Sequence, residues 1–175
     1  MNCFLHIVSA LTLLASATDA RADAVTQRED QFKAAYVFNF VKFVDWPEGV
    51  AADTVTICFA GGEGVYKALT TGIDRKRVGA RRLATLQIAE PSATGGCNAL
   101  YIDAAMATSY TFASEPAVLT ISDAAKFAER GGMIQLFTEN HRLRFLVNVD
   151  SAQRAGLRIS SDLLKLAAGV QREPR

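Results

Sequence analysis

The stretch AVLTISDAAKFAERGGMIQLF, residues Ala117–Phe137, decides the fold class. It opens with a short apolar run rich in β-branched residues, which is typical of a strand buried on both faces. Ser122 and Asp123 then offer side-chain oxygens for an N-cap, so a helix is predicted over 124–130, ended by two glycines. The strand pattern resumes after them. A buried strand that leads at once into a capped helix predicts a single-domain α/β sandwich, with a central mixed β-sheet flanked by helices.

The rest of the chain supplies the other elements of this sandwich. Apolar periodicity, capping residues and turn residues mark where each element begins and ends. The predicted elements before the central segment are a long helix over 26–46 opened by a capping box, a strand over 54–60, a short helix over 65–70, strands over 83–88 and 97–102, and a weak helix over 104–112. A hairpin over 133–149 follows it. Two short helices come last: one is capped by Asp150 or Ser151 and closed by Gly156, and the other is capped by Ser160 or Ser161 and closed by Gly169.

Residues 1–22 read as a signal peptide that is removed on export. Phe4 to Ala17 form an apolar core, and the small residues around Arg21 form a signal-peptidase site after Ala22. The apolar run is short and interrupted, which argues against a membrane anchor. Removing 22 of 175 residues leaves 153, enough for one domain over 23–175 with its own core. We expect a periplasmic protein.

Charge and cysteine content restrict the function further. The chain has 19 basic and 18 acidic residues, a net charge of +1, so no global field favours nucleic acid as a partner. Cys58 and Cys97 are the cysteines that remain after the predicted cleavage site. In an oxidising compartment two thiols most simply form one disulfide, and that pair alone does not predict a metal site.

Several motifs invite a catalytic interpretation, and each has a simpler one. The turn Gly61-Gly62-Glu63-Gly64 lacks the GK[ST] of a phosphate loop. His141 stands at a predicted hairpin tip, where a solvent-exposed side chain is the usual outcome. Asp103 and Asp123 could meet at adjacent strand ends, but each also suits a helix cap. The basic run over 74–82 fits a solvated hairpin edge or, less often, a surface for an acidic partner. We predict no enzyme activity, no cofactor and no metal.

Five segments in order resemble the YfiR-like family of exported proteins. They are KAAYVFNFVKFVDWP (33–47), ICFAGGEGVYKAL (57–69), CNALYID (97–103), VLTISDAAKFAERGGMIQLF (118–137) and RLRFLVNVDSAQRAGLRISSDLLKLA (142–167). The resemblance implies an α/β sandwich, often a homodimer, without a recognised active site. It also implies that a Cys58–Cys97 bridge matches one disulfide of the family's periplasmic repressor, whereas that repressor's second bridge has no counterpart here.

By this resemblance, the expected function is repression of an inner-membrane diguanylate cyclase through contact with its periplasmic domain, which lowers cyclic di-GMP. An outer-membrane lipoprotein that sequesters the repressor is a second implied partner. The sequence adds candidate contact residues, taken as exposed aromatic residues of the first helix and as arginines of the last third: Phe43, Trp46, Arg142, Arg144, Arg154 and Arg158. The alternative is a periplasmic small-molecule sensor or carrier, which would need a formed pocket at the strand ends.

Overall fold

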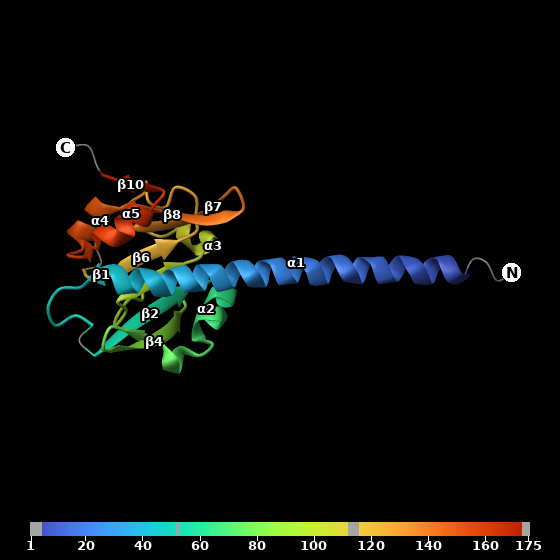
Figure 1. Cartoon of the computed structure of the whole chain (residues 1–175), viewed down its shortest axis with the longest axis horizontal. Helices are drawn as coiled ribbons and strands as arrows, with labels where there is room; N and C mark the ends of the chain where they lie inside the picture. The colour runs from blue at the N-terminus through green and yellow to red at the C-terminus, as the bar shows by residue number, and fades with distance from the viewer. Residues whose placement is uncertain (1–4, 52, 112–115, 173–175) are drawn as a thin grey trace.

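The computed structural model describes residues 5–51, 53–111 and 116–172, with the backbone alone for residues 5–22 and Asp74. Helices and strands are interspersed along the chain (Figure 1). They are α1 (Leu5–Phe40), the 3-10 helix η1 (Val41–Phe43), β1 (Val44–Asp45), β2 (Thr54–Ala60), α2 (Glu63–Thr70), the 3-10 helix η2 (Ile73–Arg75), β3 (Arg77–Val78), β4 (Arg81–Ile88), β5 (Ala99–Ile102), α3 (Ala104–Ala107), β6 (Leu119–Ser122), β7 (Ile134–Glu139), β8 (Arg142–Asn148), α4 (Val149–Arg154), β9 (Arg158–Ile159), α5 (Ser161–Leu166) and β10 (Gly169–Gln171).

In the described residues the main sheet has eight strands in the order β10-β8-β7-β6-β5-β2-β4-β3. Its centre, β7-β6-β5-β2-β4, is parallel, while β8 and β3 are antiparallel to their inner neighbours. β1 and β9 form a separate two-stranded sheet. The parallel strands β5 and β6 are buried at every position, which their unbroken apolar sequences predict. The expected mixed sheet flanked by helices is therefore confirmed.

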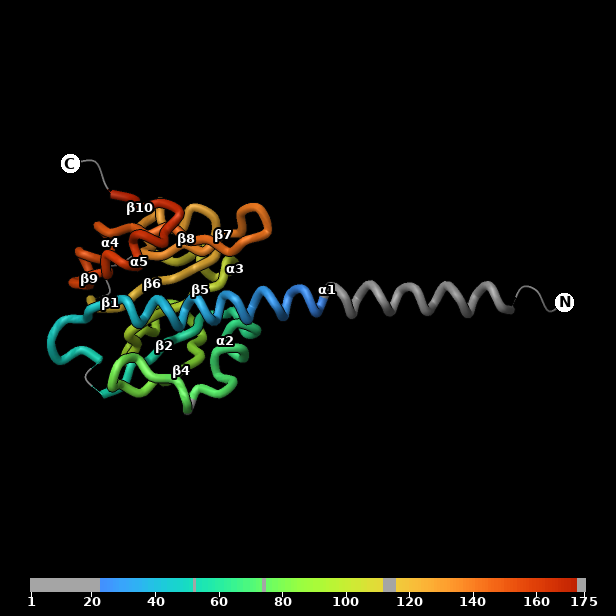
Figure 2. The backbone as a smooth tube through the Cα atoms, in the orientation of Figure 1, coloured from blue at the N-terminus to red at the C-terminus, as the bar shows by residue number. Residues whose placement is uncertain are grey.

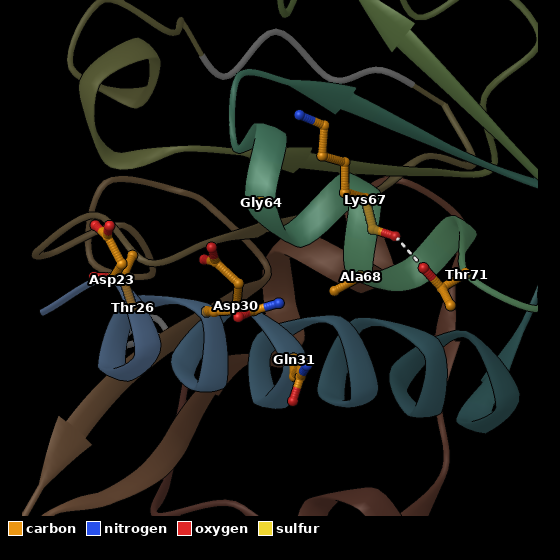
Figure 3. Close-up of a pocket in the computed structure, with 9 residues that line it drawn as sticks. Asp23, Thr26, Asp30, Gln31, Gly64, Lys67, Ala68 and Thr71 are labelled. Atoms are coloured by element: carbon orange, nitrogen blue, oxygen red, sulfur yellow. Dashed lines mark hydrogen bonds between the residues drawn. The ribbon is translucent and has the colours of Figure 1, made fainter. Parts of the chain in front are cut away.

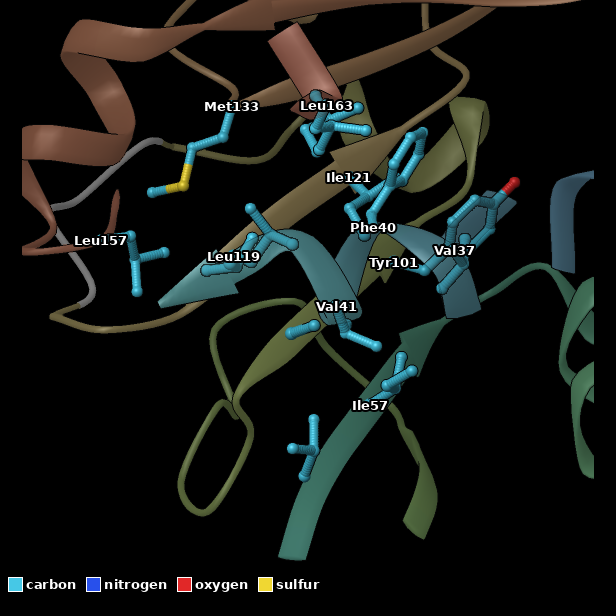
Figure 4. Close-up of a cluster of buried hydrophobic side chains, with 14 of the residues drawn as sticks. Val37, Phe40, Val41, Ile57, Tyr101, Leu119, Ile121, Met133, Leu157 and Leu163 are labelled. Carbon is cyan, nitrogen blue, oxygen red and sulfur yellow. The ribbon is translucent and has the colours of Figure 1, made fainter. Parts of the chain in front are cut away.

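The larger hydrophobic core lies between the sheet and α1, which crosses the sheet with α2 on one side and α4–α5 on the other (Figure 2). Val37 and Phe40 at the end of this helix and Val41 of η1 pack on the strands, among them at Ile57 and Leu119 (Figure 4). Phe40 also makes edge contacts with the rings of Tyr36 and Phe145. A smaller cluster on the opposite face surrounds the cysteine pair and Phe127. Two apolar faces explain why both sides of the sheet are covered.

The central segment differs from the prediction between its two strands. Residues 124–130 form consecutive turns instead of a helix. Lys126 has φ of 59°, which interrupts a right-handed helix, and the backbone N–H of Ala128 donates to the side-chain oxygen of Gln135 at 3.1 Å. The N–H groups of Phe127 and Arg130 bond to carbonyls within the segment, so turns and one contact with β7 replace a continuous i to i−4 ladder.

The first helix also differs at both ends. It begins at Leu5, so the capping-box residues near Thr26 lie inside it, and it ends at Phe40 rather than Trp46. The chain then turns through η1 because Val44 and Asp45 pair with β9. Among the residues that the structure describes, no helix is both long and apolar enough to cross a bilayer.

Shorter elements show smaller departures. The helix predicted over 104–112 is a single turn, α3, and Phe112 lies outside the described residues. Asn148, not Asp150 or Ser151, caps α4, whereas Ser160 caps α5 as predicted. Gly169 opens β10 instead of simply closing a helix. The short strands β1, β3, β9 and β10 carry too few residues for a periodic signal, so the sequence did not predict them.

Candidate functional site

The polar side chains of the interior gather where β2, β5 and β6 end. From β2 the chain passes through α2 to β4 on one side, while β5 lies on the other side of β2. This reversal of direction is the position where ligand sites form in open α/β sheets. Asp103 follows β5 and Asp123 follows β6, as the sequence predicts, and Gly61 and Gly62 follow β2.

Asp103 holds the glycine turn in place. One carboxylate oxygen accepts the N–H of Met106 at 2.8 Å and so caps α3, and the other accepts the N–H of Gly62 at 3.1 Å. Gly61 has φ of 72°, and a Cβ there would lie 2.1 Å from Asp103 Oδ2. A Cβ on Gly62 would lie 2.6 Å from the ring of Tyr101. The glycines are therefore required by close packing on these side chains, not by a phosphate.

Asp123 fixes α1 to the end of the sheet. Its Oδ2 is 2.6 Å from Lys33 Nζ, and Lys33 also pairs with Glu29 at 2.8 Å. Burial opposes the charge on Lys33, but its hydrogen bonds to Asp123 and Glu29 outweigh this, so the pKa of Lys33 is raised. The predicted N-cap role falls to Ser122, whose Oγ accepts the N–H of Ala124.

Tyr101 lies buried between these carboxylates. Burial raises the pKa of its phenol far above the ordinary value, and the negative charges of Asp123, Asp103 and Asp30 raise it further. The phenol therefore stays protonated and cannot act as a base near neutral pH. Asp103 is engaged by backbone N–H groups and Asp123 Oδ2 by Lys33, so these contacts hold elements together. Asp123 Oδ1 is buried and has no hydrogen-bond partner among the described residues.

A cleft of about 380 Å³ lies beside this network, between α1 and α2. Asp30 points from α1 toward α2, whereas the Lys67 side chain rises from α2 away from α1 (Figure 3) and its Nζ pairs with Glu63 at 3.2 Å. Burial raises the pKa of Asp30, and a Cβ on Gly64 would lie 1.9 Å from its carboxylate. The cleft has the size of a small-molecule site, and several polar side chains contribute to its lining. It is lined by Asp23, Thr26, Gln27, Asp30, Gln31, Gly64, Lys67, Ala68 and Thr71.

The sequence did not single out Lys33, Asp30 or Tyr101. Two signals pointed to them. Asp30 and Lys33 are charged residues at the start of a mostly apolar helical stretch, and three glycines within four residues indicate close approach of other groups. Those glycines allow close packing instead of binding a phosphate, since a Cβ on each would meet Asp103, Tyr101 or Asp30.

The predicted contact residues do not form one surface. Phe43 and Trp46 were expected to be exposed, and this was wrong: both are partly buried against the larger core. Trp46 Nε1 donates to the carbonyl of Asn98 at 3.2 Å, and Arg81 lies over its ring at 5.9 Å. These contacts exist because Trp46 lies beyond the end of α1 and covers the beginning of β5.

The four arginines are exposed but divide into two groups. Arg154 and Arg158 lie near the β1–β9 pair, where Arg158 is opposite Asp45. Arg142 and Arg144 lie at the far end of β8, by the β7–β8 turn (Figure 1). Arg144 pairs with Glu139 at 3.5 Å. A partner that contacts both groups would have to extend along the sheet.

The structure joins Cys58 to Cys97 in a disulfide that bridges β2 to the residues just before β5. Both cysteines are buried. His141 is exposed in the β7–β8 turn, as the sequence predicts. In the described part of the chain, no three His, Cys, Asp or Glu side chains are placed to hold a metal ion.

Comparisons with known proteins place the chain in a family. A search among curated proteins found no significant match. Among solved structures, a conserved domain protein from Vibrio cholerae O1 biovar El Tor is 12% identical, with a TM-score of 0.49, over 81% of this chain and 60% of that one. The ABC domain in complex with L-Trp from Streptococcus pneumonia is 13% identical, with a TM-score of 0.44, over 68% of this chain and 55% of that one. At these scores the likeness supports no functional conclusion. The model of the YfiR/HmsC-like family (DUF4154) matches residues 30–168, which is most of the chain, and the protein therefore belongs to that family.

Proposed function

We propose that this protein is a periplasmic regulatory binding protein that represses an inner-membrane diguanylate cyclase by contact with its periplasmic domain. Proteins of the YfiR family regulate diguanylate cyclases and are generally not enzymes. The observation that carries the proposal is the family match over residues 30–168. The buried disulfide supports an oxidising compartment, which agrees with export and with cleavage after Ala22.

The arrangement at the strand ends supports a binding role as well. Asp103, Asp123 and Lys33 are engaged in internal contacts that fix α1 and the glycine turn. A rigid body with exposed arginines at both ends of the sheet suits recognition by its surface. Repression then requires that the protein binds the inactive cyclase more tightly than the active one, because equal affinity for both states shifts no equilibrium. Sequestration by an outer-membrane lipoprotein would relieve repression by competing for the same surface, and a homodimer would present that surface twice.

The direct test is deletion of the gene and measurement of cellular cyclic di-GMP. We expect the level to rise and to return when the gene is restored. Two charge-reversal variants locate the contact: Arg154→Glu/Arg158→Glu at one end, and Arg142→Glu/Arg144→Glu at the other. We expect at least one of them to fail in restoring repression, because reversed charges oppose the complementary partner surface.

The matched control is Lys126→Glu, a charge reversal at an exposed position of the 124–130 turns. It should restore repression fully. An unchanged cyclic di-GMP level in the deletion strain, with the cyclases of the cell intact, would refute the proposed function. Equal repression by all three variants would show that these arginines do not contribute to the contact, but it would not contradict the proposed function.

The cleft between α1 and α2 favours a second candidate, a periplasmic sensor or carrier of a small polar molecule. Its volume and the carboxylate of Asp30 suit such a ligand. A ligand that binds there would raise the melting temperature of the purified protein without a protein partner. We expect Asp30→Ala to abolish that rise, and a rise that persists in the variant would exclude the cleft.

A further inference from the structure

A cavity lies beside β7, beyond the end of β6. β6 ends at Ser122, which pairs with Gln135, whereas β7 continues to Glu139. The tip of the β7–β8 hairpin points the same way as the free part of α1 (Figure 1). We call the cavity, of about 330 Å³, the β7 notch. Its lining includes Glu29 and Lys33 of α1, Asp123 after β6, Leu136 and Thr138 of β7, and Leu143 of β8.

The notch follows the edge of β7 instead of one of its faces. Four consecutive residues, 135–138, line it, although successive side chains of a strand point to opposite faces. In an antiparallel pair, alternate residues direct their N–H and C=O groups toward the partner strand. The N–H of Asn148 donates to the carbonyl of Met133 at 2.8 Å, so Met133 and every second residue after it bond to β8. The backbone of Thr138 therefore faces the notch, where no strand of the described residues pairs with it.

The end of the notch next to α1 carries a surplus of negative charge. Glu29 at 2.8 Å and Asp123 at 2.6 Å share the ammonium group of Lys33, so two carboxylates face one cation. Asp123 Oδ1 is buried and has no hydrogen-bond partner among the described residues. Burial raises the pKa of the neighbouring Asp30, Lys33 lowers it, and the charges of Glu29 and Asp123 raise it further. A cation in the notch would offset this charge.

We propose that the β7 notch binds a short extended segment of a partner protein that carries a lysine or an arginine. The segment would pair with the backbone of Thr138 as an added strand, in the row that β6 leaves, which is a known mode of peptide recognition. The edge from Leu136 to Glu139 is about 10 Å long, which matches roughly three extended residues. The basic side chain would point toward α1, where the half-exposed carboxylate of Glu29 can accept its hydrogen bonds.

An extended segment fits the notch better than a small free amine. A small amine would meet the carboxylates but would leave the edge of β7 unpaired, whereas a strand satisfies both. Phe137 also lines the notch and is half-buried on the face of β7 opposite to Thr138, so apolar neighbours of the basic residue would pack on it. The site goes beyond repression of the cyclase, because it recognises the segment without the exposed arginines.

The test is an NMR titration of the protein, purified from cells that express the full-length gene, with two synthetic peptides. They are acetyl-Thr-Val-Lys-Val-Thr-amide and the same peptide with Glu in place of Lys. We expect the lysine peptide to shift the backbone amide signals of Leu136 to Glu139 until they saturate. The glutamate peptide should bind at least about tenfold more weakly, because it brings like charges together.

Two substitutions at one position test the strand pairing. Thr138→Pro should weaken binding of the lysine peptide about tenfold, because proline has no N–H and its ring occupies the edge. Proline is tolerated there, since the N–H that it removes does not bond to β8. The matched control Thr138→Val keeps the N–H and should change the affinity by less than about threefold. Matching melting temperatures show that both variants are folded.

A third variant keeps the proposal testable if Thr138→Pro does not fold. Glu29→Gln removes one carboxylate and should narrow the difference between the two peptides, so an unchanged difference would overturn the proposal. The absence of saturable shifts, equal affinity for both peptides, or equal effects of Thr138→Pro and Thr138→Val would also overturn it. If n-butylammonium shifts the same signals with the affinity of the lysine peptide, the ligand is a small amine and the proposal is wrong. The titration does not depend on the deletion result, so the proposed function and this proposal can fail separately.

Discussion

Reduction of the Cys58–Cys97 bridge should destabilise the protein by a calculable amount. The cysteines are 39 residues apart, so the bridge closes a loop of about 40 residues in the unfolded chain. On the chain-entropy model, opening that loop costs roughly 4 kcal/mol at 25 °C. Both sulfur atoms lie among apolar side chains, where a reduced thiol is well tolerated, so no large desolvation cost should be added. For a domain of this size the loss corresponds to a fall in melting temperature of roughly 8–16 °C.

The assay is urea unfolding of the protein with and without a reductant, after reduction in denaturant and refolding. We expect the free energy of unfolding to fall and the m-value to rise, because the reduced unfolded chain exposes more surface. The variant Cys58→Ala/Cys97→Ala is the control. Its free energy of unfolding should be the same with and without the reductant. It should also be lower than that of the reduced protein, because the variant loses buried sulfur contacts.

Three results would refute this reasoning. Mass spectrometry that finds two free thiols in the protein as isolated would show that the bridge is absent. Free energies that agree within about 1 kcal/mol in the two redox states would show that loop closure does not dominate. An unchanged m-value would show that the bridge does not act on the unfolded chain.

Three further predictions concern α1 and its contacts. Phe40→Ala should lower the free energy of unfolding in urea by about 3–5 kcal/mol, because Phe40 is fully buried. Phe32→Ala on the same helix, at a 55% exposed position, should change it by less than about 0.5 kcal/mol. Similar losses in the two variants would contradict the packing described. Gly64→Ala should destabilise the wild-type chain, because the added Cβ would meet Asp30. In the Asp30→Ala variant the same substitution should instead stabilise the protein by up to about 1 kcal/mol, because alanine favours a helix more than glycine does. A change in unfolding free energy of the same sign in both backgrounds would exclude the contact. The pKa of Lys33 is raised in the folded protein, so the stability that its charge contributes is complete below the ordinary lysine pKa of 10.5 and is lost as pH rises through the higher folded-state pKa. Thermal melts of the wild type and Lys33→Met should therefore converge above pH 10.5 and not at lower pH.

The sequence predicted those elements whose signal is local. Thr54–Ala60 reads as a buried strand, and β2 has those bounds. The turn between the last two long strands was placed correctly, since Asn140 and His141 both have positive φ, the conformation of a tight hairpin. The cysteine pair was also predicted, because only two thiols follow the leader. Each of these inferences depends on a few neighbouring residues or on a simple count.

The tertiary structure decided what depends on distant partners. The apolar pattern continues to Trp46, but the helix ends at Phe40 because pairing with β9 and the carbonyl of Asn98 satisfy that segment better. The 124–130 segment has helical composition, yet the positive φ of Lys126 and the bond from the Ala128 N–H to Gln135 of β7 leave it as a series of turns. Strand order brings Asp103, Asp123 and Tyr101 together under Lys33, and it places β3 at the edge of the sheet. Strand order is fixed by the burial of two sheet faces at once, a property that no local stretch of sequence contains.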